Sequence, residues 1–528
     1  MFWIIPAIVV ALFLLISLKP FRYWSKKGVK QNSIFQLWTD SIKIIFQLIS
    51  PAELTLNLHN RFDQERYIGT CYYFSPLLFL RDPEIIKQIA IKDFDNFIDR
   101  IQFLNEDIEP LWTKSLFLLR GDKWKSMRAT LSPSFTSSKM KGMFGLIKDC
   151  AETFVEFFEN RQSDDESVLV KDAFSKYAND VIASAAFGVT CNSLENPNNE
   201  FYLMGKSATD FSGFWRNMSI LLIGLCPKVA KLLGLRMLPD KADKFFRKLI
   251  KDNMDMRERN GIIRPDMIHL LMEARKGKLK HDESREVDTG FATIEESAIG
   301  KEEKLQNLHL TDESITAQAL IFFFAGFDSS STLMSFIAYE LAVNPDIQER
   351  LRQEVDDTLQ RCNGSVTYEA LMQMKYLDMV VSETLRKWPT ITAIDRLCVK
   401  PYTIEPTNSD EKPITLEKGD FVWLPMYALH RDPKFYPEPD RFDPERFSDE
   451  NKSKIIPYTY LPFGMGPRSC IGNRFALLET KILFFTLLSK FNISVTNKTD
   501  IPLTLCQKQF NLAASNGIWV GFHSRQKE

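Results

Sequence analysis

One short stretch near the C-terminus, residues 462–472 with the sequence PFGMGPRSCIG, restricts the fold more than any other. It holds three glycines, Gly464, Gly466 and Gly472. Because glycine has no side chain and adopts turn dihedrals freely, a flat and bulky group can approach the backbone here. Cys470 stands just before a helix expected to begin near Ile471, where backbone N–H groups and the helix dipole favour an anion. With Arg468 nearby, the pattern predicts a thiolate that binds a metal.

The chemistry of this loop favours one axial thiolate on a haem iron over a zinc site. Zinc takes three or four clustered ligands, whereas the eight cysteines of the chain show no paired spacing and no CxxC. Phe463 is placed to shield the sulfur from water. The alternative is a glycine-rich surface turn with an incidental cysteine. The joint occurrence of these residues is rare in a chain of this composition, which favours haem.

Size and charge set broad limits on the rest of the chain. Its 528 residues exceed the length at which a single core keeps growing, so we expect one large multi-lobed domain or two domains. The net charge of −1 gives no indication of nucleic-acid binding. The 41 phenylalanines suit either ordinary core packing or an apolar binding cavity.

The N-terminal residues have the pattern of a membrane anchor. Residues 1–18 are almost wholly apolar, and their length is just sufficient to span a bilayer core. Positive charges follow this run instead of preceding it, which is typical of an uncleaved anchor with its basic flank in the cytosol. We therefore expect a single-pass anchor at 1–18, a basic linker and membrane-proximal segment at 19–50, and a folded body at 51–528. A buried N-terminal helix is the alternative.

Hydrophobic periodicity predicts a mainly helical body. One long helix is expected over 315–343, with a start signal at Thr311 and a stop at Asn344 and Pro345. Further elements are helices at 345–360, 380–388 and 473–491, and strands at 401–404, 414–424 and 509–522, the last with a turn at Asn516–Gly517. Residues 214–238 are apolar enough either to enter a membrane or to pack as an ordinary core helix.

Taken together, the motifs resemble those of the cytochrome P-450 superfamily. The loop F-G-x-G-x-R-x-C-x-G at 463–472 is similar to its haem-binding loop. Other motifs follow in the superfamily's order: W-x-x-x-R at Trp124 and Arg128, A-G-x-D-T-T/S at 325–330, E-x-x-R at Glu383 and Arg386, and P-E-R-F at 444–447. The stretches FFFAGFDSS, ETLRKWP and ASNGIWV are most similar to insect microsomal detoxification enzymes of the clan that also holds vertebrate drug-metabolising forms.

The resemblance implies a mainly α fold with a smaller β region, the cytochrome P-450 fold, with 51–528 as its catalytic domain. It implies haem b ligated by Cys470, and a monooxygenase that inserts one oxygen atom from O₂ into a lipophilic small molecule, xenobiotic or endogenous. Electrons would come from NADPH through cytochrome P-450 reductase, with cytochrome b5 as a further partner. The implied location is the endoplasmic reticulum membrane, with the catalytic body facing the cytosol. The alternatives are a haem-thiolate isomerase or dehydratase acting on peroxides, and a non-catalytic haem carrier or sensor.

The same resemblance assigns roles to individual residues. The residues implied to contact haem are Trp124, Arg128, Arg396, Phe463, Gly464, Gly466, Arg468 and Gly472. Arginine suits the two haem propionates because its planar fork of donors matches a carboxylate. A buried network that braces the segment beneath the haem, without taking part in the chemistry, is implied for Glu383, Arg386 and Arg446. The implied substrate pocket is lined by 101–120 and by Ala325, Thr390, Ile391 and Ile518.

Oxygen chemistry is implied for polar residues in the middle of the long helix. An unpaired buried carboxylate is costly, so Asp328 must have a partner or water. Asp328 and the hydroxyl of Ser329 would relay the two protons that oxygen cleavage needs. The alternative is that the serines bond back to carbonyls of their own helix. Ser329 stands where the superfamily usually has threonine, so a methyl group is lost and the hydroxyl is kept.

Overall fold

The computed structural model describes residues 19–72, 75–161, 167–211, 213–277, 290–294, 310–407, 409, 411–509 and 511–525. The predicted anchor at 1–18 lies outside these residues. The described chain is mainly helical with three small sheets, as predicted.

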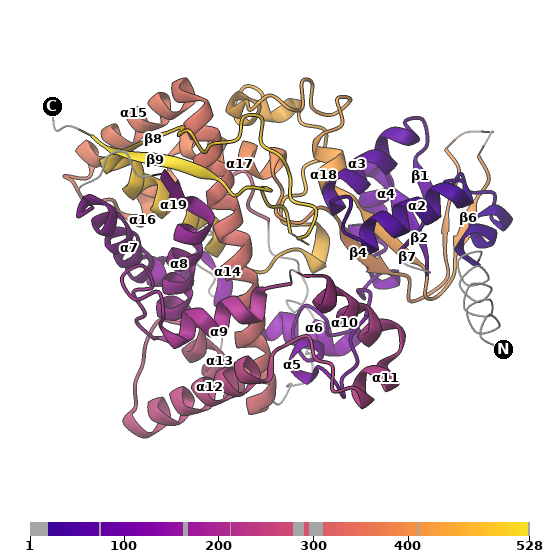
Figure 1. The fold of residues 1–528 in the computed structure, drawn as a ribbon, viewed down its shortest axis with the longest axis horizontal. Coiled ribbons are helices and arrows are strands. Elements are labelled where there is room, and N and C mark those ends of the chain that lie inside the picture. Colours follow the sequence, from indigo (N-terminus) through magenta and orange to yellow (C-terminus); the bar gives the residue numbers. More distant parts are fainter. Residues whose placement is uncertain are drawn as a thin grey trace.

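The α-helices of the described chain differ widely in length (Figure 1). The first group is α2 Ile34–Ile45, α3 Pro51–Arg61, α4 Pro83–Lys87, α5 Pro110–Thr113, α6 Gly121–Leu131, α7 Ser137–Glu159 and α8 Val170–Ile182. The second group is α9 Glu200–Thr209, α10 Phe214–Leu225, α11 Pro227–Leu232, α12 Asp240–Asn260, α13 Met267–Arg275 and α14 Asp312–Val343. The last group is α15 Pro345–Arg361, α16 Tyr368–Met372, α17 Lys375–Lys387, α18 Met426–His430 and α19 Asn473–Lys490.

The long helix α14 runs through the middle of the molecule and is surrounded by other helices (Figure 1). Thr311 caps it, because its side chain accepts a hydrogen bond from the backbone N–H of Ser314 at 3.2 Å. Among the described helices, α14 alone is long and apolar enough to cross a membrane, but 67% of its apolar window is buried inside the protein. It is therefore the core helix of the fold, and the predicted bounds of 315–343 are close to the observed ones.

The largest sheet has the strand order β1-β2-β7-β4. Its strands are β1 Tyr67–Tyr72, β2 Ser75–Leu80, β7 Phe421–Leu424 and β4 Ile394–Leu397. Strand β2 runs parallel to β7, whereas β4 runs antiparallel to β7 and pairs Arg396 with Val422. Side chains alternate along a strand, and in β4 the buried ones are Ile394 and Arg396. The sheet thus directs a charged side chain into the protein.

Two smaller sheets complete the β region. Strands β3 Ser167–Leu169, β9 Trp519–Ser524 and β8 Phe491–Ser494 form one, and β5 Tyr402–Ile404 and β6 Ile414–Leu416 form the other. The strand predicted over 509–522 is too long, because regular pairing begins only at Trp519 and is preceded by an isolated bridge between Leu505 and Ala514. The predicted turn is present, and Gly517 has a φ of +73°.

Candidate functional site

The loop at 462–472 is folded tightly around its glycines. Gly464 and Gly466 adopt φ values of +78° and +68°, which side chains disfavour. A Cβ atom on Gly466 would lie 1.9 Å from the carbonyl oxygen of Ala90, so only glycine fits there. The N–H of Cys470 donates to the carbonyl of Phe463 at 2.8 Å and closes the loop. Helix α19 begins at Asn473, the first residue of the helix predicted over 473–491, after a turn formed by Ile471 and Gly472.

Cys470 has accessible surface although protein atoms surround it on all sides. The side chain therefore faces an internal space and not bulk water. Burial raises the pKa of its thiol, although the N–H of Gly472 and the charges of Arg128 and Arg100 oppose this rise. The predicted positive surroundings are present, but they do not outweigh burial. Within the described ranges, no group of three His, Cys, Asp or Glu side chains could hold a metal ion, so these residues form no zinc site.

Three predicted arginines surround this loop, and each is almost completely buried: Arg128, Arg396 and Arg468. Their hydrogen bonds go mainly to backbone carbonyls. Arg128 Nη1 donates to Ser469 O at 2.8 Å, and Arg468 donates to Ile98 O at 2.8 Å and Leu119 O at 2.6 Å.

The charges of Arg396 and Arg468 are poorly compensated. Burial and the neighbouring Arg100 lower the pKa of Arg396 to about 9, and burial, Arg100 and Arg396 lower the pKa of Arg468. The nearest carboxylate of Arg468 is Asp99, at 3.8 Å. Arg396 Nε has no hydrogen-bond partner among the described residues. A ligand with two carboxylates would relieve this repulsion, so the chemistry of the site fits the propionates of haem.

Trp124 lies within the same cluster. It is on α6 one helical turn before Arg128, and its side chain is buried. The guanidinium of Arg468 lies 4.0 Å from the Trp124 ring, a cation–π contact. The structure thus brings together residues that are far apart in sequence, from α6, β4 and the Cys470 loop.

The structure also brings together Glu383, Arg386 and Arg446. Arg386 Nε and Nη2 donate to the two carboxylate oxygens of Glu383 at 2.7 and 2.8 Å, and both side chains are fully buried. Arg446 Nε lies 3.6 Å from Glu383 Oε1, and the N–H of Asp443 donates to the same oxygen at 2.9 Å. Such a bidentate buried pair is costly to break, because one charge would be left unpaired. It ties α17 to the chain segment that leads into the Cys470 loop.

Asp328 has the partner that its burial requires. Lys171 of α8 donates to Asp328 Oδ1 at 2.9 Å, and Asn511 Nδ2 donates to Oδ2 at 2.5 Å. Burial alone raises the pKa of Asp328, but the charge of Lys171 and both hydrogen bonds outweigh it and leave this pKa below its usual range. Asp328 is therefore an ionised member of an ion pair. Lys171 was not predicted, and no local pattern identifies it, since 157 residues separate the partners.

Ser329 and Ser331 of α14 bond back to their own helix. Ser329 Oγ donates to Ala325 O at 2.5 Å, and Ser331 Oγ donates to Phe327 O at 2.7 Å. This is the alternative that the sequence left open for these hydroxyls. Lys171 Nζ also donates to Ser331 Oγ at 2.8 Å and to Thr332 Oγ1 at 2.7 Å, so the lysine organises the polar part of the helix.

The predicted substrate residues lie on separate parts of the fold. Ala325 has accessible surface, whereas Phe323 and Phe327 on the same helix are buried. The carbonyl of Thr390 accepts from the N–H of Leu512 at 3.3 Å, so the C-terminal segment reaches this region through Leu512. Ile518 lies instead next to β9, where its carbonyl accepts from Val170.

Aromatic side chains pack around Phe324, the residue before Ala325 on α14. The ring of Phe324 on α14 contacts Trp112 of α5 at 4.7 Å and Phe211 at 5.3 Å between ring centroids. Ile391, which follows Thr390, keeps 37% of its surface exposed. The aromatic residues belong to three separate segments, so no single sequence pattern marks them as neighbours.

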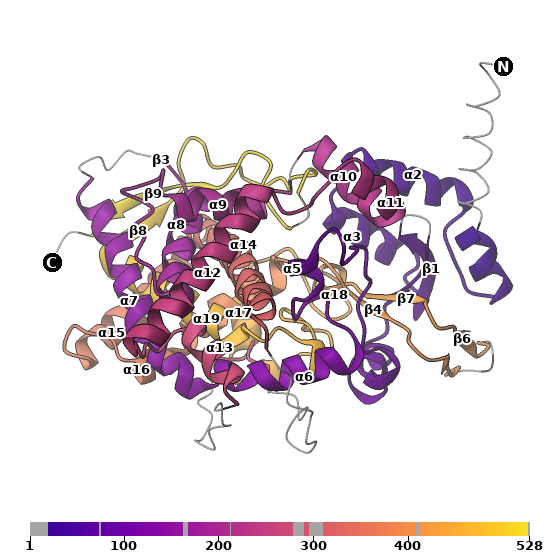
Figure 2. The same ribbon diagram turned by 90° about the horizontal axis from the view of Figure 1, so that it is seen from below.

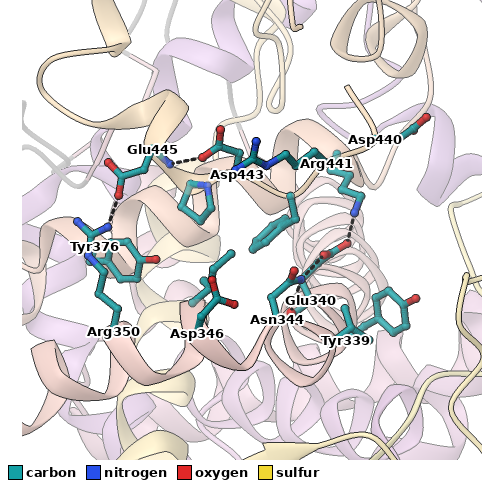
Figure 3. A pocket seen from close by; sticks show the side chains of 15 residues that line it. Tyr339, Glu340, Asn344, Asp346, Arg350, Tyr376, Asp440, Arg441, Asp443 and Glu445 are labelled. Carbon is teal, nitrogen blue, oxygen red and sulfur yellow. Dashed lines mark hydrogen bonds and ion pairs between the residues drawn. The ribbon is translucent and has the colours of Figure 1, made fainter. Parts of the chain in front are cut away.

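A pocket of about 510 Å³ lies at the C-terminal end of α14, against α15 and residues 440–445 (Figure 3). Its walls are largely charged. Glu340 accepts from Lys387 Nζ at 2.8 Å and from Trp388 Nε1 at 2.6 Å. None of the predicted haem or substrate residues lines this pocket, so it is separate from the predicted site.

Comparison with known proteins identifies the family. Residues 55–520 match the cytochrome P450 family. The chain is 45% identical to cytochrome P450 9e2 of Blattella germanica, over 96% of this chain and 94% of that protein. It is 41% identical to probable cytochrome P450 9f2 of Drosophila melanogaster, over 89% and 88% of the two chains. It is also 35% identical to cytochrome P450 6k1 of Blattella germanica, over 98% and 96%.

These matches span nearly the whole folded body, and none of the three relatives is named as an isomerase or a haem carrier. The family binds a haem whose iron is held by a cysteine thiolate, and it receives electrons from a reductase. Its substrates are lipophilic. The chain belongs to the cytochrome P450 family and is a haem-thiolate monooxygenase.

Proposed function

We propose that Cys470 is the thiolate ligand and that the buried arginines around it hold the haem propionates. The observation that carries this proposal is the position of three buried arginines, Arg128, Arg396 and Arg468, around the Cys470 loop, where the charges of Arg396 and Arg468 repel each other. The other residues of the haem contact are Trp124, Phe463, Gly464, Gly466 and Gly472. When bound, the haem supplies the reduction of O₂ that the monooxygenase reaction needs.

The polar residues of α14 have a role in proton delivery. The reaction RH + O₂ + 2e⁻ + 2H⁺ → ROH + H₂O consumes two protons at a site that apolar side chains keep dry. In our proposal Ser329 Oγ releases Ala325 O and holds a water that donates these protons. Asp328, kept ionised by Lys171, accepts protons from solvent and passes them inward.

Electrons reach the haem from the side of Cys470, through NADPH-dependent reductase and, in this proposal, also cytochrome b5. Helix α6 carries exposed Lys123 and half-buried Lys125, and it contributes Trp124 and Arg128 to the site. In Figure 2, α6 lies along the edge of the molecule opposite to α2, α10 and α11. Acidic partners would dock on this basic edge.

The substrate in this proposal is a lipophilic small molecule, xenobiotic or endogenous, in a pocket that includes Ala325, Thr390 and Ile391. The aromatic contacts of Phe324 with Trp112 and Phe211 support an apolar lining. A screen of lipophilic compounds against the purified holoenzyme, followed by shifts of the haem absorption band, tests this proposal. Product formation that needs NADPH and reductase would then separate a true substrate from a bystander.

The proposed membrane association concerns the N-terminal segment and one edge of the folded body. We propose an anchor at 1–18, a linker at 19–50 and a catalytic domain at 51–528, at the endoplasmic reticulum and facing the cytosol. Helices α2, α10 and α11 lie along one edge of the molecule (Figure 2). Large apolar side chains are exposed there, among them Phe35, Trp215 at 80% and Leu232 at 86%. Such a patch supports contact with lipid.

Removal of the apolar side chains on this edge is expected to weaken membrane binding. In a chain that lacks residues 1–18, Trp215→Asp and Leu232→Asp should each lower the partition into phosphatidylcholine vesicles about tenfold, because burial of one large apolar side chain contributes about 1.5–3 kcal/mol. Ile263→Asp is the matched control, since Ile263 is 82% exposed but lies between α12 and α13. Equal partition of all three variants in a vesicle sedimentation assay would remove this edge from the proposal.

The cytosolic orientation predicts that the chain carries no N-linked glycan. Five Asn-x-Ser/Thr sequons begin at Asn217, Asn363, Asn451, Asn492 and Asn497. Asn363 and Asn497 are exposed, so a lumenal body would present usable acceptors. Protein from insect cells should therefore keep its mass after treatment with a glycosidase. A glycosidase-sensitive decrease in mass would reverse the proposed topology.

A further inference from the structure

Residues 290–294, with the sequence GFATI, dock beside the elements that carry the thiolate loop. The N–H of Phe291 donates to Asp378 Oδ2 of α17 at 2.8 Å. At the other end, the N–H of Ile294 donates to Asn473 Oδ1 at 3.4 Å. Asn473 is the first residue of α19, so this short segment bridges the helix of the Glu383–Arg386 pair and the helix that follows Cys470.

Phe291 is the apolar anchor of the segment. Its ring centroid lies 5.1 Å from that of Phe447 and 5.5 Å from that of Tyr460. Both partners lie in the chain that leads into the loop at 462–472, and Tyr460 donates its hydroxyl hydrogen to Ser382 O of α17 at 2.9 Å. Ala292, the next residue, is only 3% exposed. The segment is thus packed as part of the core, against the incoming side of the loop.

Asn473 links the segment directly to the cysteine. Its Nδ2 donates to the carbonyl of Cys470 at 2.9 Å, while its Oδ1 accepts from Ile294. The amide is buried, and its two ends contact the cysteine and the docked segment. Hydrogen bonds to a residue that ligates a metal orient that ligand and tune the strength of its bond to the metal.

Gly290 allows the segment to approach this closely. Its φ is +125°, and an added Cβ would lie 1.8 Å from Asp378 Oδ1 and 2.9 Å from Lys481 Nζ. Asp378 and Lys481 form an ion pair at 2.9 Å, and Lys481 is fully buried. Any side chain at position 290 must therefore displace the segment or this pair.

We propose that residues 290–294 are a positioning clamp for the thiolate ligand. By holding Asp378, Tyr460 and Asn473 in one arrangement, the clamp fixes the loop of Cys470 and keeps its sulfur in the ligating form. The clamp makes no contact with substrate and contributes no reacting group. The inference rests on the proposed assignment of Cys470 and goes beyond it, because no motif of the haem loop includes this segment.

The test compares Gly290→Ala with Gly277→Ala in the full-length holoenzyme. Gly277 has a φ of +66° and nothing within 4 Å of an added Cβ, so alanine there changes a glycine at positive φ without touching the clamp. Two rates are measured at one mild urea concentration: the conversion of the ferrous–CO spectrum from the thiolate to the thiol form, and the transfer of haem to apomyoglobin. We expect both rates to rise about tenfold in Gly290→Ala and in Phe291→Ala, and to change little in Gly277→Ala.

Unfolding of the helices, followed by far-ultraviolet circular dichroism, separates the clamp from general stability. The proposal requires the thiolate spectrum to be lost well before helical structure. Equal rates in Gly290→Ala and Gly277→Ala would overturn it, and so would simultaneous loss of the spectrum and of the helices. Failure of the Cys470 assignment looks different, because Cys470→Ala would then keep the thiolate band from the start.

Discussion

Replacement of Cys470 by alanine is expected to abolish the red-shifted band that a thiolate-ligated haem shows when the reduced protein binds CO. The sulfur faces an internal space, and its loop is closed by the hydrogen bond from Cys470 N–H to Phe463 O. Alanine keeps this backbone bond and the glycine turns, so the loop should still form. What is lost is the thiol that we propose as the iron ligand, so product formation should fall to the background level.

The control for this variant is another cysteine of the same chain. Cys226 is exposed and lies between α10 and α11, outside the predicted haem contacts. Cys226→Ala should keep the band, the haem content and the turnover of the unchanged enzyme. If Cys470→Ala retains the band, another residue binds the iron and the site must be assigned again.

Helices of the C-terminal half were largely predictable because they are long and are either apolar on all sides or amphipathic. Helix α14 has the predicted Thr311 cap, and α15 and α19 agree with the predicted helices within one residue, whereas α17 begins at Lys375 and not at the predicted residue 380. The C-terminal strand was predicted too long, because apolar residues of an irregular buried segment resemble those of a strand. Only the residues from Trp519 onward find a partner strand.

The site was predictable where a motif is local and not where charge balance decides. The glycine loop and the Glu383–Arg386 pair are close in sequence, so their contacts follow from spacing. The raised pKa of Cys470 could not be predicted in this way, because its burial comes from distant elements and outweighs the nearby cations. Lys171 is the other example, since it approaches Asp328 only after α8 packs on α14.

Ser329→Ala is expected to uncouple the enzyme while leaving haem content and substrate binding nearly unchanged. In the structure Ser329 Oγ donates to Ala325 O of the same helix. Because such a bond back to the helix adds little stability, loss of the hydroxyl should hardly change the free energy of unfolding. The effect should appear in proton delivery, which contributes about 10²–10⁴-fold when a group is well positioned. Product per NADPH should fall, and the unused electrons should leave as hydrogen peroxide.

Matched variants at the same position sharpen this test. Ser329→Thr should retain or improve coupling, because the added methyl group restricts rotation of the side chain. Ser330→Ala is the neighbouring control, since Ser330 is buried and lies one position further along α14. Unchanged coupling and rate in Ser329→Ala with several substrates would assign the relay to Ser330 or to water alone.

Asp328 and Lys171 are expected to act as one unit in this delivery. Asp328→Asn keeps the shape but removes the charge, so turnover should slow. Lys171→Met removes the cation that lowers the pKa of Asp328, together with the donors to Ser331 and Thr332, and should slow turnover to a similar degree. If the two residues act through their 2.9 Å ion pair, the double variant should lose little more than either single variant. Independent, multiplying losses would instead mean that Lys171 only supports the helix, because a structural contact and a proton path would then be separate contributions to the rate.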